Sequence, residues 1–238
     1  MRRGNKLFAS PHCYEKKKVM KFEDIKWPKR IFVGGIGTDV GKSYATGWLA
    51  REMAAVGHSV ITQKLVQTGC VDESDDIRTH RKIMNIPMLT VDHTKITSPL
   101  IYKYPASPHL AADMEGEEVK IELIDEATRI LEKQYHHVLI EGAGGLMVPL
   151  KHDYLTIEYV KERKLPVILV TNGELGSISD TLLSLYALAH SRIKIFGVVY
   201  NPHFDKDRKI AEETKRYLRE WVLHHYPDTL WMEMPDSL

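Results

Sequence analysis

The sequence is poor in several features that would assign it to a specialised class of protein. Only two of its 238 residues are cysteines, Cys13 and Cys70, which is too few for a disulfide framework and is typical of a reducing cytoplasm. No apolar run approaches the roughly 18 residues that a membrane-spanning helix needs. The formal net charge is only +1, so the overall charge indicates neither a nucleic-acid partner nor a membrane partner. We therefore expect a cytoplasmic protein without either partner.

The chain also lacks internal repeats and low-complexity linkers. A hydrophobic fraction of 43% and a charged fraction of 27% are ordinary for a globular domain, and the length suffices for one α/β core. Residues 1–29 stand apart because they are rich in Lys and Arg and contain no apolar segment of the kind found in secretory signals. We predict that residues 1–29 form a disordered or loosely attached tail and that residues 30–238 form a single domain.

Short runs of Val, Ile and Leu alternate with segments of helical periodicity. The predicted strands are 31–33, 59–63, 100–102, 138–140, 166–170, 195–200 and an edge strand at 230–232. The predicted helices are 44–56, 75–84, 119–134, 155–162, 178–190 and 205–222. Continuous apolar strands that alternate with helices are typical of a parallel sheet covered on both faces. The sequence thus predicts a three-layer α/β fold with a mostly parallel sheet of about seven strands.

What the sequence does contain is a glycine-rich stretch between the first predicted strand and the first predicted helix. Residues 34–43 read Gly-Gly-Ile-Gly-Thr-Asp-Val-Gly-Lys-Ser. In a phosphate-binding loop, glycines let backbone N–H groups surround a phosphate, Lys42 reaches the β- and γ-phosphates, and the Ser43 hydroxyl ligates Mg²⁺. The glycine at Gly35 makes the loop one residue longer than the strict pattern. A glycine turn without a ligand is the alternative, but Gly-Lys-Ser at a strand-to-helix junction favours a P-loop NTPase-like fold.

Other polar residues share one position in the predicted fold. Lys64, Glu141, Thr171 and Asn201, like Gly35, lie at or just past the carboxyl end of a predicted strand. Ligands of open parallel sheets bind at that edge. We therefore expect these residues to surround an active site.

Two acidic positions suggest a metal ion beside the phosphates. Glu141 ends an apolar strand, where a buried carboxylate needs a cation, and Mg²⁺ is the natural partner; the alternative is a carboxylate that accepts amide hydrogen bonds. Asp75 and Asp76 are a second candidate, and the sequence leaves open which of them faces the metal. Lys64 alone also fits an ordinary surface lysine, and His109 fits a helix start without chemistry.

Several motifs, in this order, resemble those of the ATP-dependent dethiobiotin synthetase family. They are Gly35-Ile36-Gly37-Thr38-Asp39-Val40-Gly41-Lys42-Ser43, Lys64-Leu65-Val66-Gln67-Thr68-Gly69, Ser107-Pro108-His109, Ile140-Glu141-Gly142-Ala143-Gly144-Gly145 and Leu175-Gly176-Ser177-Ile178-Ser179. The resemblance covers most of the chain from Ile31 to Pro235 and explains the longer glycine loop, which is the spacing of that family.

The resemblance implies that the chain forms dethiobiotin from 7,8-diaminopelargonic acid, CO₂ and ATP, by way of a carbamate and a carbamic-phosphoric anhydride. It implies catalytic roles for Lys42, Lys64 and Thr38. The implied nucleotide-binding residues are Gly37, Thr38, Asp39, Val40, Gly41, Lys42, Ser43, Asn201, Met232, Glu233, Met234 and Pro235. The implied Mg²⁺ ligands are Ser43, Asp76 and Glu141, and the implied substrate-binding residues are Lys64, Thr68, Gly144, Gly176, Ser177 and Ser179. It also implies a homodimer with shared active sites, in which the helix start at 176–179 binds the substrate carboxylate of the neighbouring subunit.

Three alternatives to this interpretation differ from it in features that the sequence shows. A partitioning or positioning ATPase typically carries a second lysine early in the glycine loop, and no lysine stands there. An amidating synthetase of cobalamin synthesis carries a glutaminase domain after the ATPase, for which we expect no room in 238 residues. A nucleotide-binding module without catalysis is the third alternative, and Lys64 and Glu141 count against it.

Overall fold

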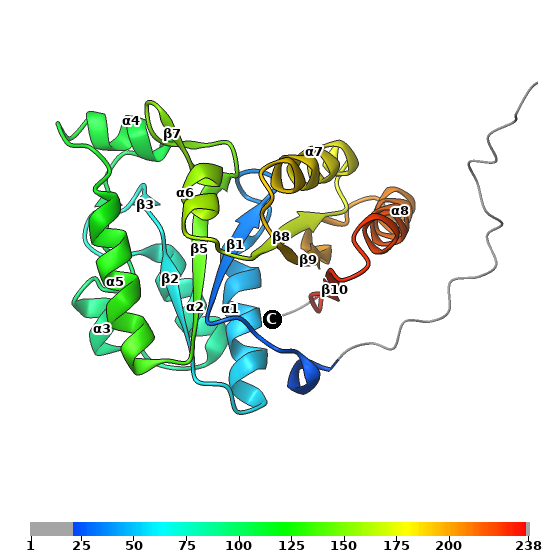
Figure 1. Cartoon of the computed structure of the whole chain (residues 1–238), viewed down its shortest axis with the longest axis horizontal. Helices are drawn as coiled ribbons and strands as arrows, with labels where there is room; N and C mark the ends of the chain where they lie inside the picture. Colours follow the sequence, from blue (N-terminus) through cyan, green and yellow to red (C-terminus); the bar gives the residue numbers. More distant parts are fainter. Residues whose placement is uncertain (1–20, 237–238) are drawn as a thin grey trace, which may run out of the picture.

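A six-stranded parallel sheet forms the centre of the computed structural model, which describes residues 21–236 (Figure 1). The spatial order is β2 (Val60–Lys64), β5 (His137–Gly145), β1 (Arg30–Gly35), β8 (Val167–Asn172), β9 (Ile195–Asn201) and β10 (Leu230–Glu233). Every neighbouring pair is parallel, so all carboxyl ends meet at one edge. The parallel sheet and the P-loop-like order of elements confirm the predicted fold class.

The strand count differs from the prediction by the segment at 100–102. Its strand, β4 (Ile101–Tyr102), pairs with β3 (Gln67–Thr68) in a separate two-stranded sheet. This happens because the chain leaves the main sheet after Lys64, and the residues that follow offer β4 an extended partner. A further small sheet joins β6 (Pro149–Lys151) and β7 (Tyr154–Leu155), which are antiparallel.

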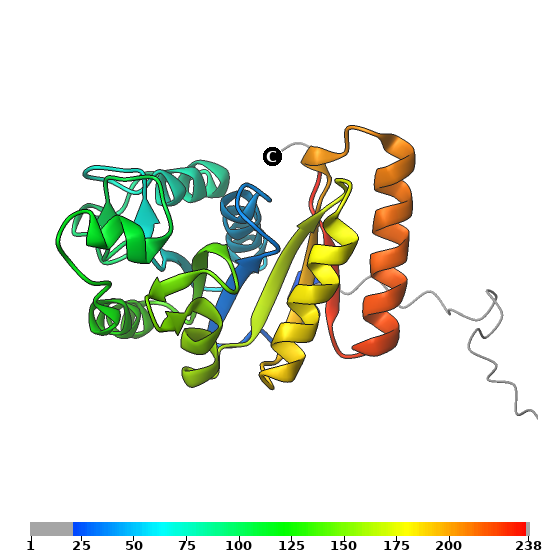
Figure 2. The ribbon, with the colours of Figure 1, turned by 90° about the horizontal axis from the view of Figure 1, so that it is seen from above.

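Helices cover both faces of the sheet, as Figure 2 shows from above. On one face, α1 (Lys42–Ala55) packs against Ile31 and Val33 of β1, with α2 (Asp75–Met84) beside it. The opposite face, which includes Phe32, carries the other long helices. These are α5 (Ile121–Gln134), α6 (Thr156–Glu162), α7 (Ser177–His190) and α8 (Arg208–His225). The alternation along β1 is what a sheet with two buried faces requires.

The remaining elements are short. They are α3 (Thr90–His93), α4 (Pro108–Asp113), η1 (Phe22–Asp24) and η2 (Pro202–Phe204). The predicted helix boundaries hold within a few residues, and α8 begins later than predicted because the Asp207 side chain accepts hydrogen bonds from the amides of Lys209 and Ile210. Within residues 21–236, no helix has the length and apolarity needed to cross a bilayer.

The segment before β1 packs on the domain. Ile25 and Trp27 are buried, the Phe22 ring meets that of Trp48 at 5.6 Å, and the Trp27 ring meets that of Phe196 at 5.6 Å. The sequence had placed residues up to 29 in a loosely attached tail, so the packed region starts earlier than expected. The physical reason is that these few apolar side chains, too sparse to show a periodic pattern, cover the exposed flank of α1. The rest of the predicted tail, residues 1–20, lies outside the described residues.

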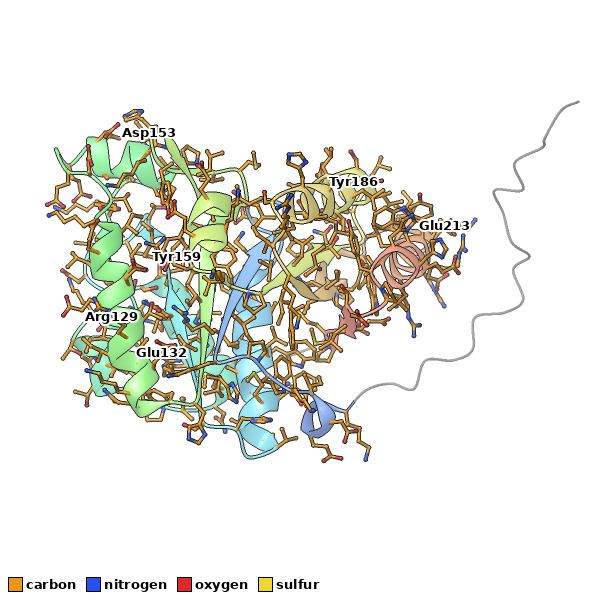
Figure 3. All side chains as sticks on the ribbon, viewed as in Figure 1. Arg129, Glu132, Asp153, Tyr159, Tyr186 and Glu213 are labelled. Atoms are coloured by element: carbon orange, nitrogen blue, oxygen red, sulfur yellow. The ribbon has the colours of Figure 1, made fainter. Side chains whose placement is uncertain are left out.

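A polar contact joins two helices on the α5 side of the sheet. Tyr159 of α6 is buried, with the guanidinium carbon of Arg163 4.1 Å from its ring centroid, and Arg163 Nε donates to Asp125 Oδ1 of α5 at 2.6 Å. Tyr159 accordingly lies between the helices in Figure 3, whereas Arg129 and Glu213 lie on the outer faces of their helices. This contact joins α5 to α6 on the face of the sheet opposite α1.

Candidate active site

The loop between β1 and α1 has the backbone that close approach to a ligand requires. Gly41, the residue before α1, has φ +86°, and a Cβ added there would lie 2.1 Å from Asn201 Nδ2. Lys42 Nζ folds back over the loop and donates to the Gly37 carbonyl at 2.6 Å. Burial, with repulsion from Lys64, lowers the pKa of Lys42 to about 8. The loop thus brings its glycine backbone and one buried amine to the cleft, as anion binding at a helix N-terminus requires.

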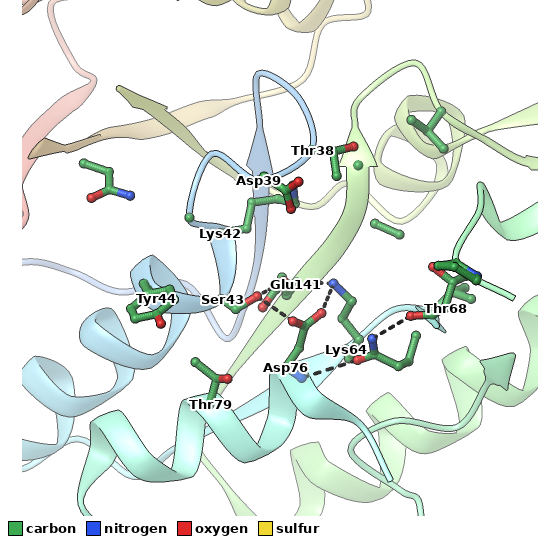
Figure 4. A pocket seen from close by; sticks show the side chains of 18 of the residues that line it. Thr38, Asp39, Lys42, Ser43, Tyr44, Lys64, Thr68, Asp76, Thr79 and Glu141 are labelled. Carbon is green, nitrogen blue, oxygen red and sulfur yellow. Dashed lines mark hydrogen bonds and ion pairs between the residues drawn. The ribbon is translucent and has the colours of Figure 1, made fainter. Parts of the chain in front are cut away.

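Next to the loop, two carboxylates, a hydroxyl and an ammonium converge (Figure 4). Ser43 Oγ donates to Asp76 Oδ1 at 2.8 Å and lies 2.9 Å from Glu141 Oε1. Lys64 Nζ lies 2.5 Å from Asp76 Oδ2 and 2.8 Å from Glu141 Oε1. The strand register brings this about, because Lys64 of β2 pairs directly with Glu141 of β5.

The structure separates the two aspartates that the sequence left open. Asp76 faces the cluster, whereas Asp75 turns outward, where its carboxylate accepts from Arg78 at 2.7 Å and from Cys70 Sγ at 3.3 Å. Both residues lie in the first turn of α2, after the Ser74 cap, and neighbouring helical positions point in different directions.

Charge pairing dominates the buried part of the cluster. Burial alone raises the pKa of Glu141, but the Lys64 ammonium and the His80 hydrogen bond outweigh it and hold that pKa well below its ordinary value. Burial alone likewise lowers the pKa of Lys64, and the carboxylates of Glu141 and Asp76 hold it above its ordinary value. The site therefore contains a fixed ammonium that is paired with the carboxylates of Glu141 and Asp76.

These donors fit a magnesium ion that is also bound to phosphate. Within residues 21–236, no group of three or more His, Cys, Asp or Glu side chains could hold a metal ion alone. Mg²⁺, however, commonly uses one or two carboxylates and takes its other ligands from water and phosphate. Ser43, Asp76 and Glu141 offer only oxygen atoms, and Lys64 Nζ already occupies a cation position between the two carboxylates.

Most predicted site residues line one cleft of about 1040 Å³. They are Thr38, Asp39, Gly41, Lys42, Ser43, Lys64, Thr68, Asp76, Glu141, Gly144, Asn201, Met234 and Pro235. At one end the cleft continues from the loop to Tyr44, His203 and Phe204, and at the other it reaches Thr68 and the turn at 105–108. The cleft therefore extends to both sides of the phosphate loop.

Some predicted residues lie elsewhere. The side chain of Met232 is buried in the core, and Glu233 pairs with Lys215 at 3.3 Å. Gly37 and Val40 belong to the loop but contribute carbonyl contacts, Val40 by accepting from Asn201 Nδ2 at 3.1 Å. Gly176, Ser177 and Ser179 form the start of α7 and do not line the cleft of their own chain.

Two further expectations can be compared with the structure. Thr171, expected at the rim, is fully buried and bonds to Thr181 Oγ1 at 2.7 Å, because β8 is covered by α7 at that point. His109 lies in the first turn of α4, where the sequence fits a helix start.

Sequence reasoning missed His80. Its Nε2 lies 2.6 Å from Glu141 Oε2, and the side chain is fully buried. The available signal was helical spacing, because His80 follows Asp76 by one turn of α2 and so lies on the same face.

The parallel sheet, the glycine loop that leads into α1 and the carboxylate beside Ser43 together define a nucleotide-binding protein of the P-loop class. A domain family described as AAA domain matches residues 29–222. A plasmid partition protein of Borrelia burgdorferi, solved with AMPPNP, superposes with a TM-score of 0.54 at 18% identity over 90% of each chain. At that identity the likeness concerns the fold alone.

Curated relatives give the closer assignment. The chain is 44% identical over 206 residues to an ATP-dependent dethiobiotin synthetase of Pasteurella multocida, covering 87% of this chain and 97% of the relative. It is 42% identical over 205 residues to the synthetase of Chlorobaculum tepidum, covering 86% of this chain and 83% of that relative. The chain belongs to the ATP-dependent dethiobiotin synthetase family.

Proposed function

We propose that the chain is an ATP-dependent ligase that converts 7,8-diaminopelargonic acid and CO₂ into dethiobiotin in biotin biosynthesis. The observation that carries the proposal is Lys64, an ammonium outside the phosphate loop that lies between Asp76 and Glu141 and lines the same cleft as Lys42. An ammonium at this place can neutralise both the transferring phosphoryl group and an anionic acceptor such as a carbamate. The cytoplasmic location expected from the sequence is part of this proposal.

The reaction balances in three steps. One amine of the substrate attacks CO₂ and loses a proton, which gives a carbamate. A carbamate oxygen attacks the γ-phosphorus and ADP leaves, which gives the carbamic-phosphoric anhydride. The second amine attacks the carbonyl carbon, loses a proton and expels phosphate, which closes the cyclic urea.

The residues of the cleft position and neutralise the reacting groups. Lys42 leaves the Gly37 carbonyl to bind the β- and γ-phosphates, and the loop amides with Thr38 surround them. Lys64 neutralises both the carbamate and the γ-phosphate. Thr68 and Gly144, on the Lys64 side of the cleft, contact the carbamate end of the substrate.

Mg²⁺ would be held by Ser43, Asp76 and Glu141. It would neutralise charge on the phosphate oxygens during transfer. At the base end, Asn201, the backbone of Met232 and Glu233, and Met234 and Pro235 form the adenine side of the site.

A homodimer with shared sites is also part of this proposal. The cleft of one chain offers cations for phosphate but does not include the helix start at 176–179, which suits a substrate carboxylate. Leu175, Leu183 and Tyr186 on and before α7 are 88%, 65% and 58% exposed. Contact with a second copy would cover this apolar surface and bring the start of α7 to the neighbouring cleft.

The partitioning-type ATPase is not favoured as an alternative, because the relatives at 42% and 44% identity are dethiobiotin synthetases. The direct test incubates the purified protein with diaminopelargonate, ATP, Mg²⁺ and isotopically labelled bicarbonate, and measures the product by mass spectrometry. We expect labelled dethiobiotin and equal amounts of ADP. ATP hydrolysis that does not depend on the diamine, without dethiobiotin, would refute the proposal.

A further inference from the structure

His80 is a fully buried histidine to which neither the proposed reaction nor the predicted site assigns a role. It projects from α2 toward the sheet, and its imidazole lies between two polar side chains of neighbouring strands. Nε2 is 2.6 Å from Glu141 Oε2 of β5, and Nδ1 is 3.0 Å from Thr62 Oγ1 of β2. Both ring nitrogens are therefore engaged in the interior of the protein.

The direction of each hydrogen bond follows from the partners. An ionised carboxylate only accepts, so His80 Nε2–H donates to Glu141 Oε2. Thr62 Oγ1 accepts from Arg81 Nη1 at 2.8 Å, and when His80 is neutral with its proton on Nε2, the hydroxyl of Thr62 donates to Nδ1. In this arrangement the ring proton is on Nε2, where the carboxylate needs it.

The two oxygens of Glu141 are consequently used for different purposes. Oε2 is turned to His80, away from the cleft, whereas Oε1 is turned to Ser43 Oγ at 2.9 Å and to Lys64 Nζ at 2.8 Å. Without a donor at Oε2, the carboxylate would be free to rotate about its last bond and present either oxygen. The bond from His80 thus selects one orientation of the group that faces the phosphate loop.

His80 is itself anchored from behind. Arg81, 1% exposed, donates through Nε and Nη2 to the two oxygens of Asp92 at 2.9 and 2.8 Å, and through Nη1 to Thr62. This connects α3, α2 and β2 on the face that carries the site. Both ring nitrogens of His80 are therefore bonded to side chains, Glu141 and Thr62, and Thr62 is itself fixed by Arg81.

We propose that His80 is a positioning residue that fixes the Glu141 carboxylate for the magnesium ion bound with ATP. The inference rests on the proposed role of Glu141 as a metal ligand. Partners that orient a metal-ligating group typically contribute 10- to 100-fold to metal affinity. His80 touches neither substrate nor nucleotide, so its effect should appear in the magnesium dependence before it appears elsewhere.

Two amide variants separate positioning from packing. The side-chain nitrogen of Gln overlays Nε2 of histidine, so His80→Gln keeps a donor for Glu141; that of Asn overlays Nδ1, so His80→Asn loses it. The measurement is calorimetric binding of AMPPNP with Mg²⁺ and, separately, with EDTA. His190→Asn, at the exposed end of α7, is the control for an amide replacing an imidazole.

We expect His80→Asn to weaken AMPPNP binding about 10- to 100-fold in Mg²⁺ and to leave binding in EDTA unchanged. His80→Gln should remain close to wild type in both conditions. In steady-state assays, the Mg²⁺ concentration for half-maximal rate should rise in His80→Asn by more than kcat falls. Thr62→Val, which removes the anchor but keeps His80, should weaken Mg²⁺-dependent binding less, and it provides the test if His80→Asn does not fold.

Equal losses in His80→Asn and His80→Gln, or an equal loss with EDTA, would show that His80 only packs, and would leave the proposed function intact. If His80→Asn does not fold and only Thr62→Val can be measured, unchanged Mg²⁺-dependent binding of AMPPNP in Thr62→Val counts against the inference. If Mg²⁺ adds nothing to AMPPNP binding in the wild-type protein, the proposed metal role of Glu141 fails, and the inference fails with it.

Discussion

The two lysines of the cleft differ in the partners that hold them. Lys42 Nζ bonds to a carbonyl of its own loop, whereas Lys64 Nζ is paired with Asp76 and Glu141 from two other elements. Lys42 is therefore available to the nucleotide as soon as phosphate displaces a single hydrogen bond. Lys64 belongs instead to the group of charges at which phosphoryl transfer is proposed to occur.

Substitution of each lysine should consequently have a different effect. Lys42→Ala should weaken ATP binding and abolish turnover, whereas Lys64→Ala should retain most of the ATP affinity and lose roughly 10²–10³ in kcat. Lys64→Ala should also lower the melting temperature in EDTA, because Asp76 and Glu141 lose their counter-ion. Calorimetric ATP titration, steady-state rates and thermal unfolding measure the three quantities. An unchanged kcat in Lys64→Ala would remove Lys64 from the mechanism.

Asp92 offers a prediction about stability and pH. Burial alone raises its pKa, but hydrogen bonds from Arg81, Leu89 and Thr97 outweigh it and hold the pKa below the ordinary value of 3.8. The stabilisation is thus fully present above that ordinary value and is lost as pH falls through the lower value of the folded state. Asp92→Asn should lower the free energy of unfolding at neutral pH by about 3–5 kcal/mol.

Urea denaturation of wild type and Asp92→Asn at several pH values measures this effect. The difference between the two proteins should be constant from neutral pH down to about pH 5 and should narrow with further acidification. Asp153→Asn, at an exposed turn, is the matched control and should change little. A difference that persists unchanged in strong acid would mean that the carboxylate charge is not its source.

For individual residues, the sequence allows prediction of those that belong to a local motif. Lys42 and Ser43 are fixed by the loop, and Glu141 by its place between an apolar strand and glycines. The residues alone did not distinguish Asp76 from Asp75, although the family resemblance implied Asp76. Helical spacing puts His80 on the Asp76 face of α2, but the contact of His80 with Glu141 could not be predicted from it. The orientation of Asp76 and the contact of His80 both depend on the rotation of α2 against β2 and β5, which is set by packing between segments far apart in the chain.

Among the elements, the segment before β1 departs most from expectation. Its aromatic side chains complete the covering of α1, and Trp27 Nε1 donates to the Phe22 carbonyl at 3.2 Å. A segment of this kind stabilises the domain through burial of a few large side chains rather than through regular hydrogen bonding.

We therefore expect different results on the two sides of Met20. A protein that begins at Met20 should keep its melting temperature and activity, because Phe22, Ile25 and Trp27 remain. Trp27→Ala should reduce the free energy of unfolding by about 3–5 kcal/mol. Lys26→Ala, at an exposed neighbour, is the control for changes in this segment. Thermal and urea unfolding measure the stability of both variants, and an activity assay completes the test of the truncated protein. A Trp27→Ala protein as stable as wild type would mean that the segment before β1 contributes little to stability. Loss of activity on removal of residues 1–19 would assign those residues a role.

Elements of the main sheet were predictable because a parallel strand covered on both faces must be apolar throughout. The two-stranded pairs β3–β4 and β6–β7 were not recognised as sheets. Each contains strands of two or three residues with polar members, and such strands are defined by their partner rather than by their own composition.

For the molecule as a whole, the proposed shared site can be tested by complementation. Lys42→Ala should inactivate the site of its own subunit. Ser179→Asp should place a like charge where the substrate carboxylate of the other subunit binds, and an acid in the first turn does not disturb the helix. Ser179 is exposed, whereas the neighbouring Gly176 has φ +103° and would be strained by any side chain.

A hybrid dimer of these two inactive variants contains one intact site. With random pairing about half of the dimers are hybrids, so roughly a quarter of wild-type activity should return on co-expression. Two different affinity tags and tandem purification isolate the hybrid, and Ser179→Ala is the uncharged control. If the purified hybrid is inactive while wild-type hybrids prepared in the same way are active, the sites are not shared.

The alternation of polar side chains along strand β2 also affects how the chain folds. Thr62 and Lys64 face α2 and the site, whereas Gln63 faces α5, where its Oε1 accepts from Thr128 at 2.8 Å. A shift of one residue in the pairing of β2 with β5 would turn Gln63 toward the phosphates and bury Thr62 and Lys64 against α5. The contact of Lys64 with Asp76 on the α2 side of the sheet and the contact of Gln63 with Thr128 on the α5 side would then be broken at once. The polar side chains of β2, including the proposed catalytic Lys64, thus also disfavour the nearest misfolded register of their strand.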